Sequence, residues 1–172
     1  DTEEDPDKET TYLKNLLQRR IDGLVYIPVF QHKSLDRQLK HLPFPLVFVD
    51  RHITDDYDCV QSNNQAGISL LVSHLFSRGY REMALVGGPS QSINGSERET
   101  AFRAMLGQYG LDAATNPVVN GDFTIDGGYQ ATRQLLARPN RPRAIVAANN
   151  LMGMGALKAI KEAGLRIPAD LA

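Results

Sequence analysis

The chain has 172 residues, and its 19 Lys and Arg stand against 20 Asp and Glu, which gives a formal net charge of −1. This balance does not predict a basic face of the kind that binds nucleic acid. A hydrophobic share of 42% predicts a soluble globular protein with a real core. No apolar run approaches the roughly 18–20 residues that a membrane-spanning helix needs. The single cysteine, Cys59, excludes an internal disulfide and is typical of a reducing compartment, so we expect a cytoplasmic location.

Helices and strands are predicted to alternate along the chain. Short apolar runs bounded by Gly, Pro or Asp predict buried strands over residues 24–27, 46–49, 59–61, 83–86, 117–119 and 144–147. Apolar residues at helical spacing predict helices that start near Pro6, Asn64, Glu97, Asp126 and Asn150, with a weaker one over residues 34–40. Such alternation predicts parallel sheets with helices on both faces and right-handed crossovers. By itself this pattern indicates an α/β protein, a class that carries many functions.

One stretch, residues 83–98, combines features of a ligand site. Its apolar run ends on Gly87-Gly88-Pro89, and we expect a polar loop over residues 90–96 before a helix that carries Arg98 in its first turn. Open α/β sheets bind ligands beyond the carboxyl ends of their strands. A cation in the first turn faces the positive end of the helix dipole. We therefore expect an anionic or hydroxyl-rich ligand to contact Arg98.

Several blocks of sequence indicate a particular family and not only an α/β fold. They follow one another over essentially the whole chain. They are Asp5-Pro6 with Tyr12-Leu13, residues 20–24, 45–51, 63–67 and 74–81, Gly87-Gly88-Pro89 with Arg98 and Phe102, residues 121–129 and residues 148–170. Together they resemble the effector-binding domain of the LacI/GalR family of bacterial transcriptional repressors. The resemblance implies a two-lobed α/β fold like that of type I periplasmic binding proteins, each lobe a parallel sheet flanked by helices. It places residues 1–79 in the N-terminal lobe and residues 80–172 in an incomplete C-terminal lobe.

The same resemblance implies segments that the chain does not match. Members of the family carry an N-terminal helix-turn-helix and a first strand–helix–strand unit, and they continue into further strands that complete both lobes. We therefore expect a chain truncated at both ends, with the DNA-binding helix-turn-helix absent. Operator DNA would be contacted only through that missing N-terminal domain.

The resemblance also assigns ligand contacts to individual positions. Arg98 matches an arginine that reaches into the interlobe cleft, where its rigid fork of donors suits hydroxyls or carboxylates. Asp50 follows a strand and is expected to accept sugar hydroxyls, with capping of its own loop beside Arg51 as the alternative. Phe123 matches an aromatic that stacks on the effector, and a core phenylalanine is the alternative. Further hydrogen bonds to the ligand are expected from Asn94, Ser92 and Asn149. Asn150 departs from the Asp usual in the family, and we expect it to cap a helix.

Catalytic and metal sites are not predicted. The four histidines His32, His41, His52 and His74 lack the spacing of metal ligands, and Cys59 has no histidine near it in the sequence. The glycines at positions 87 and 88 lack the third glycine of a dinucleotide loop. We expect no enzyme activity, no metal and no cofactor.

The expected function is effector sensing in a LacI-type repressor that closes on a small polar metabolite such as a sugar. The alternative from another class is an extracytoplasmic sugar-binding protein of a transport system, which shares the fold. Met152, Met154 and Leu157 lie on a helix whose family counterparts pack across a twofold axis, so we expect a homodimer there. Methionines adapt equally well to a core, which is the other interpretation of this face.

Overall fold

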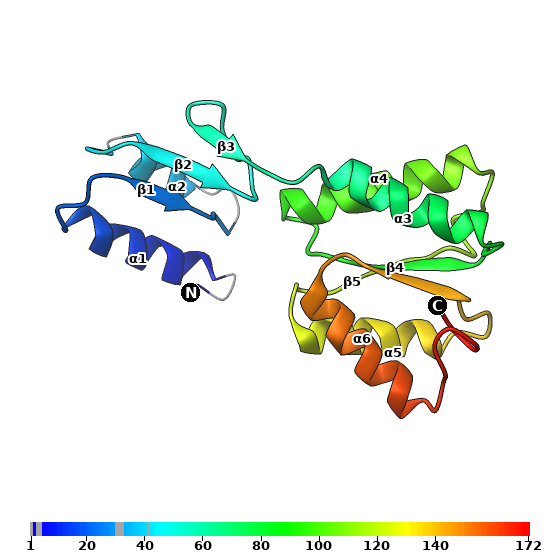
Figure 1. Cartoon of the computed structure of the whole chain (residues 1–172). Helices are drawn as coiled ribbons and strands as arrows, with labels where there is room; N and C mark the ends of the chain where they lie inside the picture. The colour runs from blue at the N-terminus through cyan, green and yellow to red at the C-terminus, as the bar shows by residue number, and fades with distance from the viewer. Residues whose placement is uncertain (1, 3–4, 30–32, 41) are drawn as a thin grey trace. The chain divides into compact units, whose positions relative to one another are not determined.

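The computed structural model describes residues 2, 5–29, 33–40 and 42–172. The chain divides into two compact units, Asp1–Ser62 (unit 1) and Asn63–Ala172 (unit 2), and each contains its own three-stranded sheet (Figure 1). Strands 46–49 and 83–86, expected in separate sheets, do lie in separate sheets. His32 and His41 lie outside the described residues.

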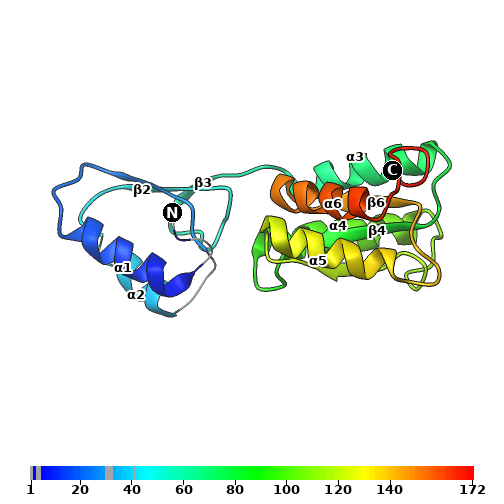
Figure 2. The ribbon, with the colours of Figure 1, turned by 90° about the horizontal axis from the view of Figure 1, so that it is seen from below.

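Unit 1 is a small parallel sheet with two helices. Its elements are α1 (Pro6–Leu17), β1 (Leu24–Tyr26), α2 (Lys33–Leu39), β2 (Leu46–Val49) and β3 (Asp58–Val60). The strands lie in the order β1-β2-β3, with Leu24 opposite Leu46 and Val47 opposite Asp58. Both helices lie on one side of this sheet, as Figure 2 shows. Leu46 and Phe48 are buried whereas Val25 is 73% exposed, so one face of the sheet forms the core of unit 1.

Unit 2 has a sheet covered on both faces. Its elements are α3 (Asn64–Ser77), β4 (Met83–Gly87), α4 (Ile93–Gln108), β5 (Val118–Asn120), α5 (Ile125–Leu136), β6 (Ala144–Ala147) and α6 (Asn150–Glu162). The three strands are parallel in the order β5-β4-β6. Helices α3 and α4 pack on one face, and α5 and α6 pack on the other (Figure 1). The central strand β4 is buried along its whole length, as its continuous apolar run predicts.

Ala172 pairs with the backbone beside β6, and Leu171 packs into the unit. The Ala172 amide donates to the Arg143 carbonyl (3.0 Å), and the Ile145 amide donates to the Ala172 carbonyl (2.8 Å). Leu171 is 1% exposed, so it contributes to the core of the unit. Ala172 therefore pairs with the backbone at the start of β6, on the side of β6 away from β4.

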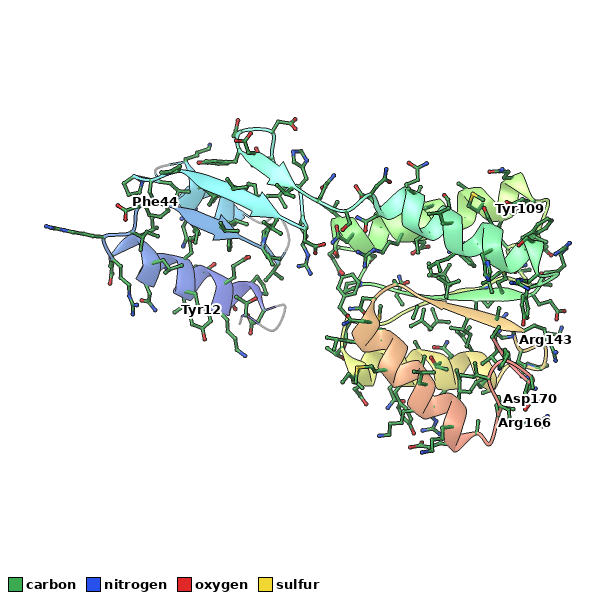
Figure 3. The ribbon with its side chains drawn as sticks, in the orientation of Figure 1. Tyr12, Phe44, Tyr109, Arg143, Arg166 and Asp170 are labelled. Carbon is green, nitrogen blue, oxygen red and sulfur yellow. The ribbon has the colours of Figure 1, made fainter. Side chains whose placement is uncertain are left out.

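The division between the units differs from the expected one at residues 79 and 80. Helix α3 packs on α4, where the rings of Phe76 and Tyr109 stack with their centroids 3.9 Å apart and the Tyr109 hydroxyl donates to Ser73 Oγ (3.0 Å). Figure 3 labels Tyr109 at the C-terminal end of α4. Val72 is fully buried in the core of unit 2. Helical periodicity shows which face of α3 is apolar but not which sheet that face covers, so the division falls before Asn63 instead.

Candidate functional site

Three helices of unit 2 begin at the carboxyl ends of its strands, and each begins with a capping side chain. Ser92 caps α4 by accepting from the Gly95 amide (3.5 Å), and Thr124 caps α5 by accepting from the Gly127 amide (3.0 Å). Asn149 caps α6 by accepting from the Met152 amide (2.8 Å). In a parallel sheet these ends meet at one edge. This edge is therefore the polar end of the unit, where α/β sheets bind ligands.

The expected loop over residues 90–96 is wrong, because α4 already begins at Ile93. The reason is local packing at Gly95, where an added Cβ would lie 2.5 Å from the Pro89 carbonyl oxygen. Gly95 lets the first turn of α4 approach the preceding segment closely, so the helix can begin inside the run of polar and small residues that suggested a loop. Arg98 consequently lies in the second turn of α4. The expectation that it is a first-turn cation at the positive end of the helix dipole is therefore wrong as well.

Arg98 is half-buried and is held by two groups from other elements. Its Nε donates to Asn64 Oδ1 of α3 (2.7 Å), and its Nη1 donates to the carbonyl of Ala148 (2.6 Å), just beyond β6. The guanidinium therefore lies at the polar edge of unit 2, fixed between α3 and the end of β6. This is the edge at which the sequence expects ligand contact.

Asn64 is a residue of this edge that sequence reasoning missed, since the sequence predicts only that a helix starts near it. The cap of α3 is Asn63, whose side chain accepts from the Ala66 amide (2.9 Å). Asn64 is 7% exposed, and its Nδ2 donates to Glu97 Oε2 (2.7 Å) and to Asn94 Oδ1 (3.2 Å). The one available signal was a second asparagine directly after the asparagine that caps the helix, because a buried amide there needs hydrogen-bond partners of its own.

The expected ligand residues Asn94 and Ser92 are both buried in unit 2. Asn94 is 2% exposed and accepts from Asn64 Nδ2, the same amide that accepts from Arg98. Ser92 is 5% exposed and serves as the cap of α4. The structure thus brings Asn94 into the network of Arg98 and gives Ser92 a structural role.

Phe123 lies in the core of unit 2, which is the alternative to effector stacking that the sequence left open. It is 7% exposed, belongs to the core of unit 2, and its ring covers Gly88 so closely that a Cβ at that glycine would overlap it. Its backbone is left-handed (φ 66°), and its carbonyl accepts from Asn149 Nδ2 (3.1 Å). Asn149 therefore links the loop before α5 to the start of α6, in addition to capping α6.

The neighbouring Asp122 shapes the same loop. Its Oδ1 accepts from the Thr124 amide (3.0 Å) and from the Thr124 hydroxyl (2.5 Å). Burial works to raise the pKa of Asp122, but these hydrogen bonds outweigh it and hold the pKa below its ordinary value. The carboxylate is therefore a stable, charged acceptor that fixes the turn into α5.

Asp50 lies in unit 1, directly after β2, with a left-handed backbone (φ 69°). Its amide donates to the Val60 carbonyl (2.9 Å), and its side chain is 40% exposed with Oδ2 3.8 Å from Arg51 Nε. Arg51 is 7% exposed and donates from Nη1 to the carbonyls of Pro28 (2.9 Å) and Val29 (2.6 Å). Asp50 is thus a half-exposed carboxylate at the carboxyl edge of its sheet, beside a buried arginine.

A buried carboxylate also holds residues 28 and 29, the segment after β1 that Arg51 contacts. Glu9 of α1 is 1% exposed and accepts from the Val29 amide (2.6 Å). Burial and the adjacent Glu9 raise the pKa of the Tyr26 hydroxyl above its ordinary value, so that hydroxyl stays neutral. Glu9 and Arg51 together hold residues 28 and 29 in place.

The expected dimer face is corrected at one of its three residues. Met152 is fully buried, and its backbone lies against Gly128 of α5, so its side chain belongs to the core of unit 2. Met154 and Leu157 are each 56% exposed, and Leu151 is 41% exposed. The exposed apolar face of α6 therefore consists of Leu151, Met154 and Leu157, because position 152 of the helix faces α5 and the sheet.

The described part of the chain contains no group of three or more His, Cys, Asp or Glu that could hold a metal ion. His52 contacts Asp55 at 3.1 Å. Burial and, secondarily, the Asp50 carboxylate raise the pKa of the Cys59 thiol, so thiolate formation is disfavoured there. Among the same residues, no helix has the length and apolar character to cross a membrane.

Comparison with known proteins gives a match along the whole sequence. Residues 1–172 match the family described as periplasmic binding proteins and sugar binding domain of the LacI family. The Ribose operon repressor of Escherichia coli (strain K12) is 32% identical over 173 residues, which cover 99% of this chain and 52% of that repressor. The chain thus spans about half the length of the curated relatives it matches.

Solved structures agree with this match. A LacI family transcriptional regulator from Enterococcus faecium with bound ribose aligns with a TM-score of 0.81 at 26% identity, over 93% of this chain and 60% of that one. The lac repressor dimer bound to operator and the anti-inducer ONPF aligns with a TM-score of 0.79 at 27% identity, over 96% of this chain and 58% of that one. This chain belongs to the family of periplasmic binding proteins and LacI-family sugar-binding domains, with a periplasmic-binding-protein-like fold.

Proposed function

We propose that this chain is the effector-sensing part of a LacI-type transcriptional repressor and that its effector is a small polar metabolite, a sugar or a sugar-like compound. The observation that carries the proposal is Arg98, held at the carboxyl edge of the sheet of unit 2 by Asn64 and Ala148. A guanidinium is a rigid, always charged fork of donors, which suits the hydroxyls of a sugar or a carboxylate. Two relatives support the class of ligand: one is named for the ribose operon, and one was solved with bound ribose.

The ligand contacts that we propose lie at the carboxyl edge of each sheet. In unit 2 they are Arg98, Asn94 and Asn149, which the network at the starts of α4 and α6 holds in place. In unit 1 it is Asp50, whose half-exposed carboxylate accepts hydroxyl protons. Ser92 and Phe123 take a lesser part in this proposal, since the cap of α4 and the core use their side chains.

Effector binding would act by population shift. The effector binds one conformation of the protein more tightly, and that difference in affinity biases operator binding. We propose a cytoplasmic homodimer that uses the exposed apolar face of α6. It contacts operator DNA through a helix-turn-helix elsewhere in the whole protein, and it has no enzymatic role. The lac repressor, one of the solved relatives, was crystallised as a dimer on its operator.

The family description also covers periplasmic binding proteins, so an extracytoplasmic sugar-binding protein is the second candidate. The curated relatives favour the repressor, because they are named as repressors. The gene decides between the two: an upstream helix-turn-helix supports the repressor, and a cleaved signal peptide supports the transport protein.

A thermal-shift screen of sugars, nucleosides and amino acids on the intact protein tests the proposed function. A ligand at 100 times its dissociation constant adds about 2.7 kcal/mol to the free energy of unfolding. We expect a sugar or sugar-like compound to raise the melting temperature and Arg98→Ala to abolish that rise. A response restricted to a different ligand class, or one that Arg98→Ala leaves intact, would contradict the proposal.

A further inference from the structure

Two consecutive residues of α4 with opposite charges share one partner on another helix. Asn64, near the start of α3, accepts from Arg98 Nε at 2.7 Å through its Oδ1. The Nδ2 of the same amide donates to Glu97 Oε2 at 2.7 Å and to Asn94 Oδ1 at 3.2 Å. The amide therefore lies between an arginine and a glutamate that are adjacent in the sequence.

The chemistry of the two neighbours explains why an amide stands there. A carboxylate only accepts hydrogen bonds and a guanidinium only donates them. A side chain that bridges the two must present a donor to Glu97 and an acceptor to Arg98 at the same time, which asparagine does. Aspartate at position 64 would serve Arg98 but would set its carboxylate against that of Glu97, and alanine would serve neither. Glu97 thus orients the amide, and the amide in turn orients Arg98.

Holding an arginine in one rotamer matters for binding. The side chain has several rotatable bonds, and a ligand that must order it spends part of its binding free energy on that ordering. In this chain Asn64 fixes the Nε side of the guanidinium and the Ala148 carbonyl fixes Nη1. Asn64 is itself 7% exposed, so it belongs to the packed contact between α3 and α4 and is held there.

We propose that Asn64 is a positioning residue for Arg98: it holds the guanidinium in the orientation in which Arg98 binds the effector, and Glu97 sets the orientation of the Asn64 amide. The part of this proposal that concerns the effector rests on the proposed function. The positioning itself is a property of the protein without ligand. Without Asn64, the Arg98 side chain would have to be ordered by the effector itself, and we expect this to weaken effector binding roughly 2- to 10-fold.

The first test needs no ligand. In the intact protein with 15N-labelled arginine, the Nε–Hε signal of Arg98 is assigned by its loss in Arg98→Lys. We expect slow exchange of this proton with water in the parent and exchange at least about 10-fold faster in Asn64→Ala. The double variant Asn64→Asp, Glu97→Gln should restore slow exchange, because the new glutamine amide donates to the new carboxylate and that carboxylate accepts from Arg98.

Two further variants separate positioning from stability. Asn116→Ala is a matched control, since Asn116 is a fully buried asparagine of unit 2 whose Oδ1 accepts from the Met83 amide (2.7 Å). Met83 is the first residue of β4, so this contact lies at the amino end of the strand and not at the carboxyl edge that holds Arg98. It should lower stability and leave the Arg98 signal unchanged. Glu97→Ala keeps Asn64 but removes the carboxylate that orients it, so it should speed the exchange of the Arg98 proton by a smaller factor. This variant decides the matter if Asn64→Ala does not fold.

The second test uses D-ribose as the probe in calorimetric titrations. Asn64→Ala should bind it roughly 2- to 10-fold more weakly than the parent, and both the double variant and Asn116→Ala should bind it like the parent. An Arg98 signal that is unchanged in Asn64→Ala or in Glu97→Ala overturns the positioning role. If the parent does not bind D-ribose, that result counts against this sugar as the effector, and the exchange measurement still decides the positioning.

Discussion

The contact between α5 and α6 depends on a glycine, and a matched pair of substitutions in α6 tests this. A Cβ at Gly155 would overlap the Ile125 carbonyl oxygen and lie 2.6 Å from the Tyr129 amide nitrogen, both of them backbone atoms. A Cβ at Gly153, two residues earlier, would meet only the Ala147 Cβ at 3.7 Å, an ordinary contact. The two glycines share one helix and differ in what an added methyl group touches.

The expected effects have opposite signs. In a helix interior, Gly→Ala gains about 0.5–1 kcal/mol from the lower backbone entropy of alanine, and Gly153→Ala should show that gain. Gly155→Ala has the same gain but must separate two helix backbones, and overpacking of this kind typically costs about 1–3 kcal/mol. The net loss should therefore reach up to about 2.5 kcal/mol. In a chain of this size each kcal/mol lowers the melting temperature by about 2–4 °C.

Urea unfolding followed by circular dichroism measures both variants against the parent. Equal slopes with denaturant would show that the difference is one of stability and not of the unfolded state. A Gly155→Ala variant as stable as Gly153→Ala would refute the reasoning, because it would mean that α5 and α6 do not approach each other at this residue.

Three further predictions concern other contacts. Tyr109→Phe keeps the ring stack on Phe76 but loses the hydrogen bond to Ser73, so it should cost about 0.5–1.5 kcal/mol in urea unfolding, and no loss would show that this bond is absent in solution. Hydrogen bonds from Arg166 lower the pKa of Asp170 from 3.8 to about 2 (Figure 3 labels both residues), so the stabilising contribution of Asp170 is present above about pH 4 and disappears as the pH falls toward 2. In an NMR titration of the Asp170 carboxyl group, Arg166→Gln should move the titration midpoint back toward 3.8, and an unmoved midpoint would contradict this ion pair. Met154→Asp should leave the fold intact and shift a dimer toward monomer in light scattering, and an unchanged dimer would place the interface elsewhere. Met152→Asp should instead unfold unit 2, because Met152 is fully buried.

Local patterns predicted the elements well because they depend on neighbours in the sequence. The apolar run at residues 83–86 became β4 (Met83–Gly87), and the helical spacing from Ile68 to Phe76 became α3 (Asn64–Ser77). The pattern failed where small and polar residues suit both a loop and the start of a helix. Residues 90–96 were expected to form a loop, although in the structure α4 begins at Ile93 and Gly95 lets its first turn pack closely on Pro89.

Contacts between distant residues could not be predicted in the same way. Whether α3 covers the sheet of unit 1 or of unit 2 depends on which helix it meets, and its sequence does not contain that partner. The role of Asn64 likewise depends on Glu97 and Arg98, which lie more than a full helix and strand later in the chain. Met152 was expected at a dimer face because the resemblance placed its helix at a twofold axis. Methionine suits both a surface and a core, and only the packing of α6 on α5 separates the two.

The structure also changes what removal of Arg98 should do to stability. As a first-turn surface residue, Arg98 would contribute little to folding. Its hydrogen bonds to Asn64 and Ala148 place it inside the network instead. Arg98→Ala removes the hydrogen-bond donor from Asn64 Oδ1 and from the Ala148 carbonyl, so it should lower the free energy of unfolding by about 1–3 kcal/mol. Binding measurements on this variant therefore need a temperature well below its own unfolding transition.

Calorimetric titration of Arg98→Ala and Arg98→Lys with the compound that the thermal-shift screen identifies tests the central claim most directly. Loss of a bidentate, charge-assisted contact should weaken binding by about 1.5–3 kcal/mol, or roughly 10- to 150-fold. Arg98→Lys should recover little of this, because an ammonium group cannot reproduce the planar fork. Binding by folded Arg98→Ala within about twofold of the parent would contradict the assignment of Arg98 to the effector site.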